Sequence, residues 1–315
     1  MILVLDAPPY STVQDLGRFG HRAQAVPPAG AMDPEALTIG NLLLGNDEGA
    51  AALELALGPG RFEAGADLSL AVTGGSCDLS IGGTAALMWS AHPVRAGTEI
   101  AIGVPGGGRF AYLCVAGGIA VPRVLGSRST YLPGRFGGHD GRMLRRGDVL
   151  PVAPQAPVTR RYDVPLPLQW RRAPDAPIRI LGGPQRAIFP DEAWDALTAG
   201  DYTVSTTADR MGYRLEGPAP GHRATAALPS EPACPGAIQV PAGSPPILLM
   251  PDGPTVGGYP KLAVVIAADL GVAGQLHPGD RPVFAPVGLT DAQDALALQR
   301  RRLEAIRAWV SAPGG

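Results

Sequence analysis

The sequence predicts a mainly β fold with a few helices, arranged as two β units in one chain. First, 43 glycines and 34 prolines, about a quarter of the 315 residues, accompany a hydrophobic content of 45%. A disordered chain would carry fewer apolar residues, so we interpret glycine and proline as turns between many short strands. Second, short apolar runs recur on both sides of a proline-rich stretch at 151–177.

A weak repetition also links the two halves. The runs "VTGG", "IAVP" and "LRRGD" recur in the same order as "ILGG", "IQVP" and "LHPGD". They are either traces of two related units or common turn chemistry. We expect an N-terminal β unit at 1–150, a linker at 151–177, a C-terminal β unit at 178–288, and a C-terminal helix with a tail at 289–315.

The first half offers five strand-like runs and one helix. The runs are "ILVLDA", "LSLAV", "CDLSIGG", "TEIAIGV" and "RFAYLCVAGG". The helix is predicted over 33–44, because Asp33 is a good N-cap, Pro34 suits the first helical position, and Gly45 can end the helix.

The linker is rich in proline, and the second half again consists of short strand-like runs with a few helices. Prolines in 151–177 block central strands and helices. Strands are expected at "IRILGG", "YTVST", "YRLEG", "AIQVP", "PILLM" and "KLAVVI", and a short helix over 190–199 before Gly200. The last helix is expected from Thr290, with Thr290 and Gln293 as a capping box. Its apolar face has helical spacing and comprises Leu296, Leu303, Ile306 and Val310.

Charge and cysteine content exclude several classes of protein. The net charge of −2 lacks the basic excess of a nucleic-acid-binding protein. Cys77, Cys114 and Cys234 are odd in number, which excludes a full disulfide framework. The N-terminal stretch "MILVLDAPPY" has five apolar positions and no basic region, which is too little for a signal peptide. No apolar run has membrane-spanning length. We expect a soluble, cytoplasmic protein without nucleic-acid or membrane partners.

The strongest catalytic motifs are absent. There is no G-x-x-x-x-G-K-[ST] phosphate-binding loop, no H-E-x-x-H, no paired C-x-x-C and no G-x-S-x-G. We therefore expect no dedicated metal site.

Two polar loops are candidates for binding. The loop at 133–148 combines glycines with basic residues: Arg135, His139, Arg142, Arg145 and Arg146. It either binds an anion through backbone N–H groups and arginines or is a solvated turn with surface arginines. In the N-terminal loop, Gln14, Asp15 and Arg18 could orient a polar substrate. Alternatively, Asp15 and Arg18 pair with each other or cap backbone groups.

The stretch "TVGGYPKLAVV" contains Lys261, the one lysine among 26 basic residues. A lysine can be desolvated to a useful pKa and can transfer a proton, which arginine cannot do. Gly257 and Gly258 allow a ligand to approach the backbone closely, and Tyr259 adds a phenol. The alternative is a compositional bias toward arginine that left one lysine at a strand edge.

Nine short motifs occur in the same order as in one protein family. They are "TVQDLGR", "PPAGAMD", "NLLLGN", "AALE", "VAGGI", "LGSRSTYLPGRFGGHDGRML", "DRMGYRLEG", "GAIQVP" and "GGYPK". The sequence resembles the KipA family, which is also the family of the C subunit of prokaryotic 5-oxoprolinase, from about residue 3 to 285. Older labels are allophanate hydrolase subunit 2 and the biotin-dependent carboxyltransferase A/B domain.

The resemblance implies two cyclophilin-like β-barrel units and an enzyme that works in a complex. With a B subunit (KipI-like) and an A subunit, such a protein cleaves 5-oxo-L-proline to L-glutamate using ATP, with Mg. An alternative is a carboxyltransferase that takes carboxyl from biotin to urea. Because the chain has no lysine between methionines, biotin would arrive on another protein. A further alternative is a non-catalytic KipA-like regulator that binds a KipI-like partner.

The resemblance and the loops together give the candidate residues. The candidate catalytic residues are Lys261, Tyr259 and His139. The candidates for substrate or phosphate binding are Arg128, Arg135, Arg142, Gln14, Arg18, Glu54, Gly257 and Gly258. The sequence departs from the family at "PDGPTVGGYP" and at Ser230, Glu231 and Pro232, which leaves substrate preference open.

Overall fold

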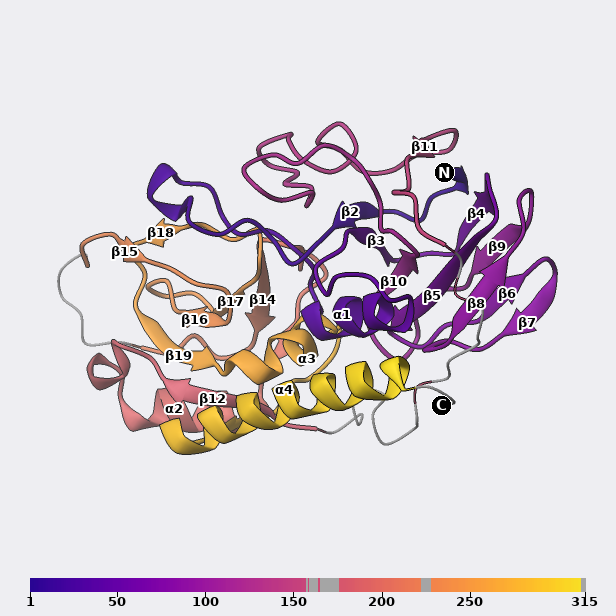
Figure 1. The fold of residues 1–315 in the computed structure, drawn as a ribbon. Helices are drawn as coiled ribbons and strands as arrows, with labels where there is room; N and C mark the ends of the chain where they lie inside the picture. The colour runs from indigo at the N-terminus through magenta and orange to yellow at the C-terminus, as the bar shows by residue number, and fades with distance from the viewer. Residues whose placement is uncertain (157, 159–163, 165–175, 222–227, 313–315) are drawn as a thin grey trace. The chain divides into compact units, whose positions relative to one another are not determined.

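The structure is a computed structural model that describes residues 1–156, 158, 164, 176–221 and 228–312. The chain divides into two compact units (Figure 1). Unit 1 comprises Met1–Arg18, Ala29–Arg171 and Arg300–Gly315, and unit 2 comprises Phe19–Pro28 and Arg172–Gln299. Most of the predicted linker lies outside the described residues.

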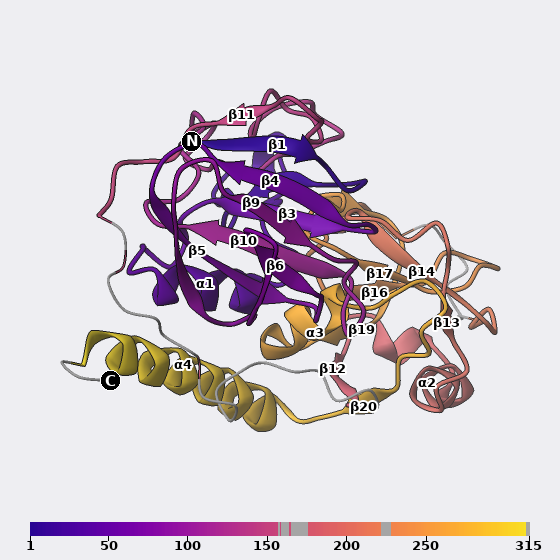
Figure 2. The same ribbon diagram turned by 90° about the vertical axis from the view of Figure 1, so that its right-hand side faces the viewer.

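Unit 1 contains two antiparallel sheets. The six-stranded sheet has the order β11-β1-β4-β9-β6-β7, and neighbouring labels in Figure 2 follow much of this order. Its strands are β1 (Ile2–Asp6), β4 (Gly60–Ala64), β6 (Leu79–Ile81), β7 (Thr84–Ala86), β9 (Glu99–Ile102) and β11 (Val149–Leu150). The five-stranded sheet has the order β2-β3-β10-β5-β8. Its strands are β2 (Thr12–Gln14), β3 (Ala52–Ala56), β5 (Leu68–Gly74), β8 (Ala91–Val94) and β10 (Phe110–Val115).

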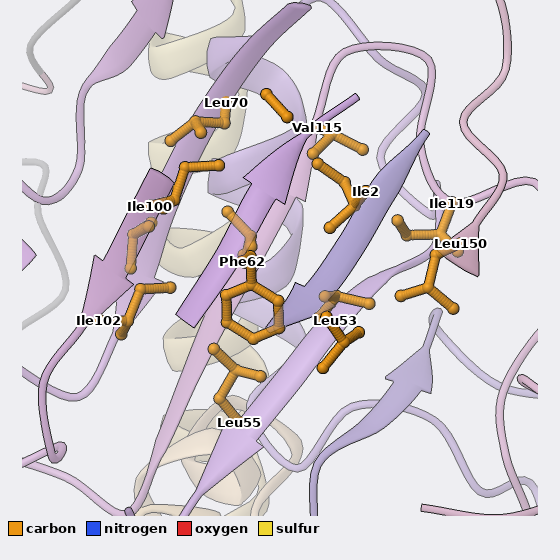
Figure 3. Packing of buried hydrophobic residues seen from close by; sticks show 14 of the residues in the cluster. Ile2, Leu53, Leu55, Phe62, Leu70, Ile100, Ile102, Val115, Ile119 and Leu150 are labelled. Atoms are coloured by element: carbon orange, nitrogen blue, oxygen red, sulfur yellow. The ribbon is translucent and has the colours of Figure 1, made fainter. Parts of the chain in front are cut away.

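The apolar core of unit 1 is built by side chains from both sheets (Figure 3). Phe62, Ile100 and Ile102 come from the six-stranded sheet, and Leu53 and Leu55 come from the five-stranded sheet. Alternate residues of β3 face this core, so Glu54 points to the opposite face of its sheet. Strand alternation thus creates a second, polar face on the five-stranded sheet.

Helix α1 (Pro34–Leu43) packs on the five-stranded sheet, where the Thr73 hydroxyl donates to the Ala36 carbonyl at 2.7 Å. Asp33 caps the helix through its Oδ1, which accepts from the Ala36 amide at 3.1 Å. Pro34 occupies the first turn, and Gly45 follows the helix with φ of 67°. The sequence prediction for this helix is confirmed.

Unit 2 is built on a seven-stranded sheet with the order β13-β14-β17-β16-β19-β12-β20. Its strands are β12 (Ile178–Gly182), β13 (Thr203–Val204), β14 (Gly212–Glu216), β16 (Ala237–Gln239), β17 (Ile247–Leu249), β19 (Lys261–Val265) and β20 (Phe284–Pro286). Only the β12–β20 pair is parallel within this described sheet. A separate ribbon pairs β15 (Glu231–Pro232) with β18 (Val256–Gly257). The prediction of a mainly β fold with two units is confirmed.

The remaining elements are short helices and one long helix. They are η1 (Arg22–Gln24), η2 (Arg186–Ile188), α2 (Asp191–Thr198), η3 (Ala267–Asp269), α3 (Leu270–Gly274) and α4 (Leu289–Ser311). The capping box predicted for the last helix is wrong in its residues. The helix begins at Leu289, so its N-cap is Gly288, two residues before Thr290, and the Gly288 amide donates to Asp291 Oδ2 at 3.1 Å.

The described residues contain no helix long and apolar enough to cross a membrane.

Candidate functional site

Lys261 lies at the start of β19 in unit 2, and its side chain is only 4% exposed. Strand β19 pairs with β16, where Ile238 is opposite Ala263 but Gln239 is opposite Lys261. This register shift leaves Leu262 as an extra residue on β19, which is a β-bulge. Bulges redirect side chains and are common beside active sites. The bulge places the Lys261 and Gln239 side chains at neighbouring positions.

Glu231 is the ion-pair partner of Lys261. Lys261 Nζ donates to Glu231 Oε1. The ribbon of β15 and β18 sets Glu231 opposite Gly257, which brings the carboxylate to the Gly-Gly-Tyr turn. The Lys261 hydrogen bond, against the opposing effect of burial, lowers the pKa of Glu231 from its usual 4.5. Glu231 is therefore ionised at neutral pH and holds the ammonium in place.

Gln185 connects these two residues from the turn after β12. Its Oε1 accepts from the Lys261 backbone amide at 3.0 Å, and its Nε2 donates to Glu231 Oε1 at 2.6 Å. The preceding Gly183 makes this possible, because a Cβ there would lie 2.2 Å from the Lys261 carbonyl oxygen. Gln185 thus positions both members of the ion pair.

Gln239 completes the group. Its side chain is 3% exposed, and its Nε2 has no hydrogen-bond partner in the structure as described. A Cβ at Gly257 would lie 3.1 Å from this Nε2. We call Gln185, Glu231, Gln239 and Lys261, with Gly257, the lysine cluster.

The other predicted residues of this turn lie at its rim. Tyr259 is 51% exposed, and the described residues provide no hydrogen bond to its hydroxyl. A Cβ at Gly258 would face the Leu228 carbonyl at 3.2 Å rather than the amide of Gln239. Of the predicted residues, Lys261 and Gly257 are thus in the cluster, while Tyr259 and Gly258 border it.

In unit 1, His139 and Arg142 meet at Asp148. Arg142 forms a bidentate pair with Asp148, at 2.8 and 2.7 Å, and His139 Nε2 lies 3.4 Å from the same carboxylate. Burial alone would raise the pKa of Asp148, but hydrogen bonds from Arg142 and from the Arg145 amide outweigh it, and the pKa falls. The Arg142 guanidinium is thus already paired with the Asp148 carboxylate.

Arg128 and Arg135 differ in their surroundings. Arg128 Nε donates to the Val121 carbonyl at 2.8 Å. Arg135 is exposed with φ of 54°, and its guanidinium makes no side-chain hydrogen bond to the described residues. Arg135 is therefore open to an external anion, as are the exposed Arg145 and Arg146 of the same loop.

Asp15 organises the N-terminal loop by capping. Its Oδ1 accepts from the Ser127 hydroxyl at 2.6 Å, the Ser129 hydroxyl at 2.5 Å and the Gly17 amide at 2.8 Å. Its Oδ2 accepts from the Arg128 amide at 2.6 Å. Of the two interpretations of this loop, the capping one describes the contacts of Asp15.

Gln14 and Arg18 are buried in the same loop region. Gln14 Nε2 donates to the Thr12 hydroxyl at 2.9 Å and to the Thr130 carbonyl at 3.2 Å, while its Oε1 has no partner among the described residues. Arg18 donates to the Ser129 carbonyl and lies 4.9 Å from the centre of the Phe136 ring. Both side chains therefore contact the loop that carries Ser129 and Phe136.

Glu54 belongs to a buried network on the polar face of the five-stranded sheet. Its Oε2 accepts from the Met32 amide and the Tyr112 hydroxyl, both at 2.8 Å. Burial, and then the charge of Glu54, raises the pKa of Tyr112 well above its usual 10. Tyr112 therefore stays protonated and donates to Glu54, while its oxygen accepts from the Asp33 amide at 2.7 Å.

Sequence reasoning identified the lysine and its glycine turn but did not select Gln185, Glu231 or Gln239. Weak signals existed: Glu231 stood in the loop that departs from the family, Gln239 in "GAIQVP", and Gln185 after a Gly-Gly pair. Within the described ranges, no group of three or more histidine, cysteine or carboxylate side chains could hold a metal ion.

Comparison with known proteins agrees with the fold and the motifs. The family model "Carboxyltransferase domain, subdomain A and B" matches residues 24–286. The chain is 37% identical to the 5-oxoprolinase C subunit of Escherichia coli, over 98% of both chains. It is 36% identical to the 5-oxoprolinase C subunit of Haemophilus influenzae, over 96% of this chain and 95% of that one.

A solved structure extends the likeness to a much longer chain. The crystal structure of the K. lactis urea amidolyase aligns with 97% of this chain and 20% of its own, at 29% identity and a TM-score of 0.90. The sequence motifs, the two β units and the family match agree. The chain belongs to the carboxyltransferase subdomain A and B family, together with the 5-oxoprolinase C subunits.

Proposed function

We propose that the chain is the C subunit of an ATP-dependent 5-oxoprolinase, which cleaves 5-oxo-L-proline to L-glutamate together with its B and A subunits. The observation that carries this proposal is the 37% identity to a 5-oxoprolinase C subunit over 98% of both chains. A match of this extent spans both β units.

The chemistry requires ATP because ring opening of a stable lactam is energetically uphill. Transfer of the γ-phosphoryl group to the lactam oxygen releases ADP and turns that oxygen into part of a better leaving group. Water then attacks the carbonyl carbon, the bond from that carbon to the ring nitrogen breaks, and the nitrogen gains a proton. The open-chain acyl phosphate that results is hydrolysed by a second water to glutamate and inorganic phosphate. A fixed cation beside the lactam oxygen would stabilise the negative charge that develops there.

The lysine cluster supplies that cation and its support. The Lys261 ammonium would lie beside the lactam or phosphoryl oxygen, held by Glu231 and Gln185. Tyr259, exposed at the rim, would donate from its phenol or carry a proton. Preorganised donors are effective because they need no reorganisation during the reaction.

ATP binding would need groups beyond the arginine loop of this chain. Arg142 is held by Asp148, whereas Arg135 is open to solvent. We propose that Arg135 contributes one contact to the phosphates of Mg-bound ATP, and that a partner protein supplies the rest of the nucleotide site.

The test is reconstitution. The chain is purified with the B and A subunits, and ATP hydrolysis is measured with and without 5-oxo-L-proline, together with glutamate formation. We expect hydrolysis that depends on 5-oxo-L-proline and on all three chains. No stimulation by 5-oxo-L-proline contradicts the proposal.

A second candidate is carboxyl transfer from carboxybiotin to urea, which the TM-score of 0.90 to a urea amidolyase favours. Its test is carboxylation of urea with a biotinylated carrier protein as the donor. A non-catalytic KipA-like regulator would bind the KipI-like B subunit without turnover in either assay.

A further inference from the structure

Gln239 presents a buried amide without a partner. Its side chain is 3% exposed, and no described group accepts from its Nε2. A buried donor left unsatisfied lowers stability, so native proteins rarely keep one without a reason. An apolar side chain of similar size would avoid that cost.

Lys261 and Gly257 are the neighbours of this amide. Gln239 is opposite Lys261 across β16 and β19, so the two side chains lie on the same face of the sheet. Gly257 stands directly beside the amide, since its missing Cβ would lie 3.1 Å from Nε2. Gly257 has no positive φ, so backbone conformation does not explain this glycine. The close approach of the Gln239 amide does, because a Cβ at Gly257 would press against Nε2.

The charges of the cluster favour a neutral acceptor. The ammonium of Lys261 is paired with the carboxylate of Glu231, which also accepts from Gln185. The pair has no net charge, and the unpaired donor is a neutral N–H. A carbonyl oxygen of an amide, lactam or urea would meet this donor without adding a buried charge.

We propose that Gln239 is a substrate-positioning residue whose Nε2 donates a hydrogen bond to the carbonyl oxygen of a neutral amide group, and that Gly257 allows the Gln239 amide to take this position. The inference rests on the proposed function for the lactam of 5-oxo-L-proline. The same donor would also hold a urea carbonyl, so the test includes both compounds.

The decisive variant is Gln239→Leu in the full chain. Binding of 5-oxo-L-proline and of urea is measured by ligand-observed NMR titration, and the thermal unfolding midpoint is measured in the absence of ligand. We expect affinity for at least one compound to fall about 2- to 10-fold, the effect of losing one hydrogen bond. The unfolding midpoint should stay the same or rise, because the variant removes an unsatisfied buried amide.

A second variant changes the surroundings of the Gln239 amide rather than the amide itself. Gly257→Ala places a methyl group beside Nε2 on a backbone that accepts alanine, and it should weaken the same ligand while Gln239 is intact. The matched controls are Gln293→Leu, exposed on α4, and Gly106→Ala, where a Cβ would meet nothing closer than 3.8 Å. Neither control should change affinity.

The outcomes separate the two proposals. Loss of urea affinity alone in Gln239→Leu supports the role of Gln239 and counts against the 5-oxoprolinase proposal. A lower unfolding midpoint with unchanged affinity shows that the amide is structural and overturns the inference. It is also overturned if the wild-type chain binds neither compound.

Discussion

Lys261 combines three properties at one residue: it is the one lysine of the chain, it is buried, and its ammonium is held by Glu231. Arginine keeps the charge but is larger, planar and unable to give up its proton at neutral pH. Lys261→Arg should therefore lower 5-oxoproline-dependent ATP hydrolysis by at least about tenfold, that is about 1.4 kcal/mol in the barrier.

Arg301→Lys, exposed on α4, is the matched control for this exchange and should retain full activity. Near-complete activity of Lys261→Arg in the reconstituted complex would show that the lysine is incidental.

Asp148 gives a prediction for pH dependence. Its pKa in the folded protein lies below the usual 3.8, because the bonds from Arg142 and the Arg145 amide outweigh burial. Its contribution to stability is thus fully present above about pH 3.8 and is lost as the pH falls through the folded pKa. Asp148→Asn should lower the thermal unfolding midpoint at pH 7, and the difference from wild type should shrink below pH 3.8.

Asp140→Asn is the control, since Asp140 is 74% exposed and should show little difference at any pH. A difference between wild type and Asp148→Asn that is constant from pH 7 to pH 2.5 would contradict the assignment.

For single residues, the sequence identified a residue that is rare in the composition, but it did not identify the neighbours that folding brings to that residue. Lys261 stood out because no other lysine exists. Glu231 and Gln185 are 30 and 76 positions away from Lys261, and glutamate and glutamine are common in surface turns. The β-bulge that pairs Gln239 with Lys261 leaves no mark on the alternation of so short a strand.

Among the elements, α1 approaches its sheet closely at Gly40. A Cβ there would lie 2.5 Å from Cys114 Sγ and 3.0 Å from Thr73 Oγ1. Alanine improves helix propensity by about 1 kcal/mol, but overpacking costs about 1–3 kcal/mol. Gly40→Ala should therefore lower the free energy of unfolding, as measured by urea denaturation.

The double variant Gly40→Ala/Cys114→Ala checks the cause, because it removes the sulfur that the new methyl group would meet. It should be more stable than the sum of the two single changes predicts. Strict additivity would exclude the proposed clash.

The loop that precedes Gly257 is anchored by a buried ion pair. Asp252 accepts from Arg210 Nε at 3.0 Å and from Nη2 at 2.9 Å, and both side chains are at most 5% exposed. Breaking such a pair leaves a buried charge and costs about 3–5 kcal/mol. Asp252→Asn should lower the free energy of unfolding by that amount.

Glu99→Gln is the surface counterpart. Glu99 lies 3.9 Å from Arg61, and the side chains are 47% and 50% exposed. Its loss should change stability by less than about 0.5 kcal/mol. Equal effects of Asp252→Asn and Glu99→Gln would show that the buried pair does not anchor the loop.

The sequence predicted the ends of a helix well where the capping residues were unambiguous. Asp33, Pro34 and Gly45 predicted both ends of α1. The N-cap of α4 was predicted two residues late, because Thr290 is a good N-cap in isolation whereas Gly288 carries no side chain to recognise. The predicted apolar face of α4 includes Ile306, which is fully buried.

For the whole molecule, the composition and the positions of glycine and proline predicted the mainly β class and the two units, but not the order of strands in the sheets. The six-stranded sheet places β1 beside β4 and β11, and the second unit pairs β12 with β19 and β20. These neighbours are distant in sequence, and turn residues carry no information about them. The grouping of Phe19–Pro28 with unit 2 is likewise a product of tertiary contacts.

The one lysine also makes the protein unusually easy to observe. Expression with lysine labelled with ¹³C at Cε and ¹⁵N at Nζ would produce a single side-chain resonance in the whole chain. That resonance would come from the cluster itself, without any mutation or attached probe. Its chemical shift would report directly on the ion pair with Glu231, in the free chain and in any assembly that the chain forms.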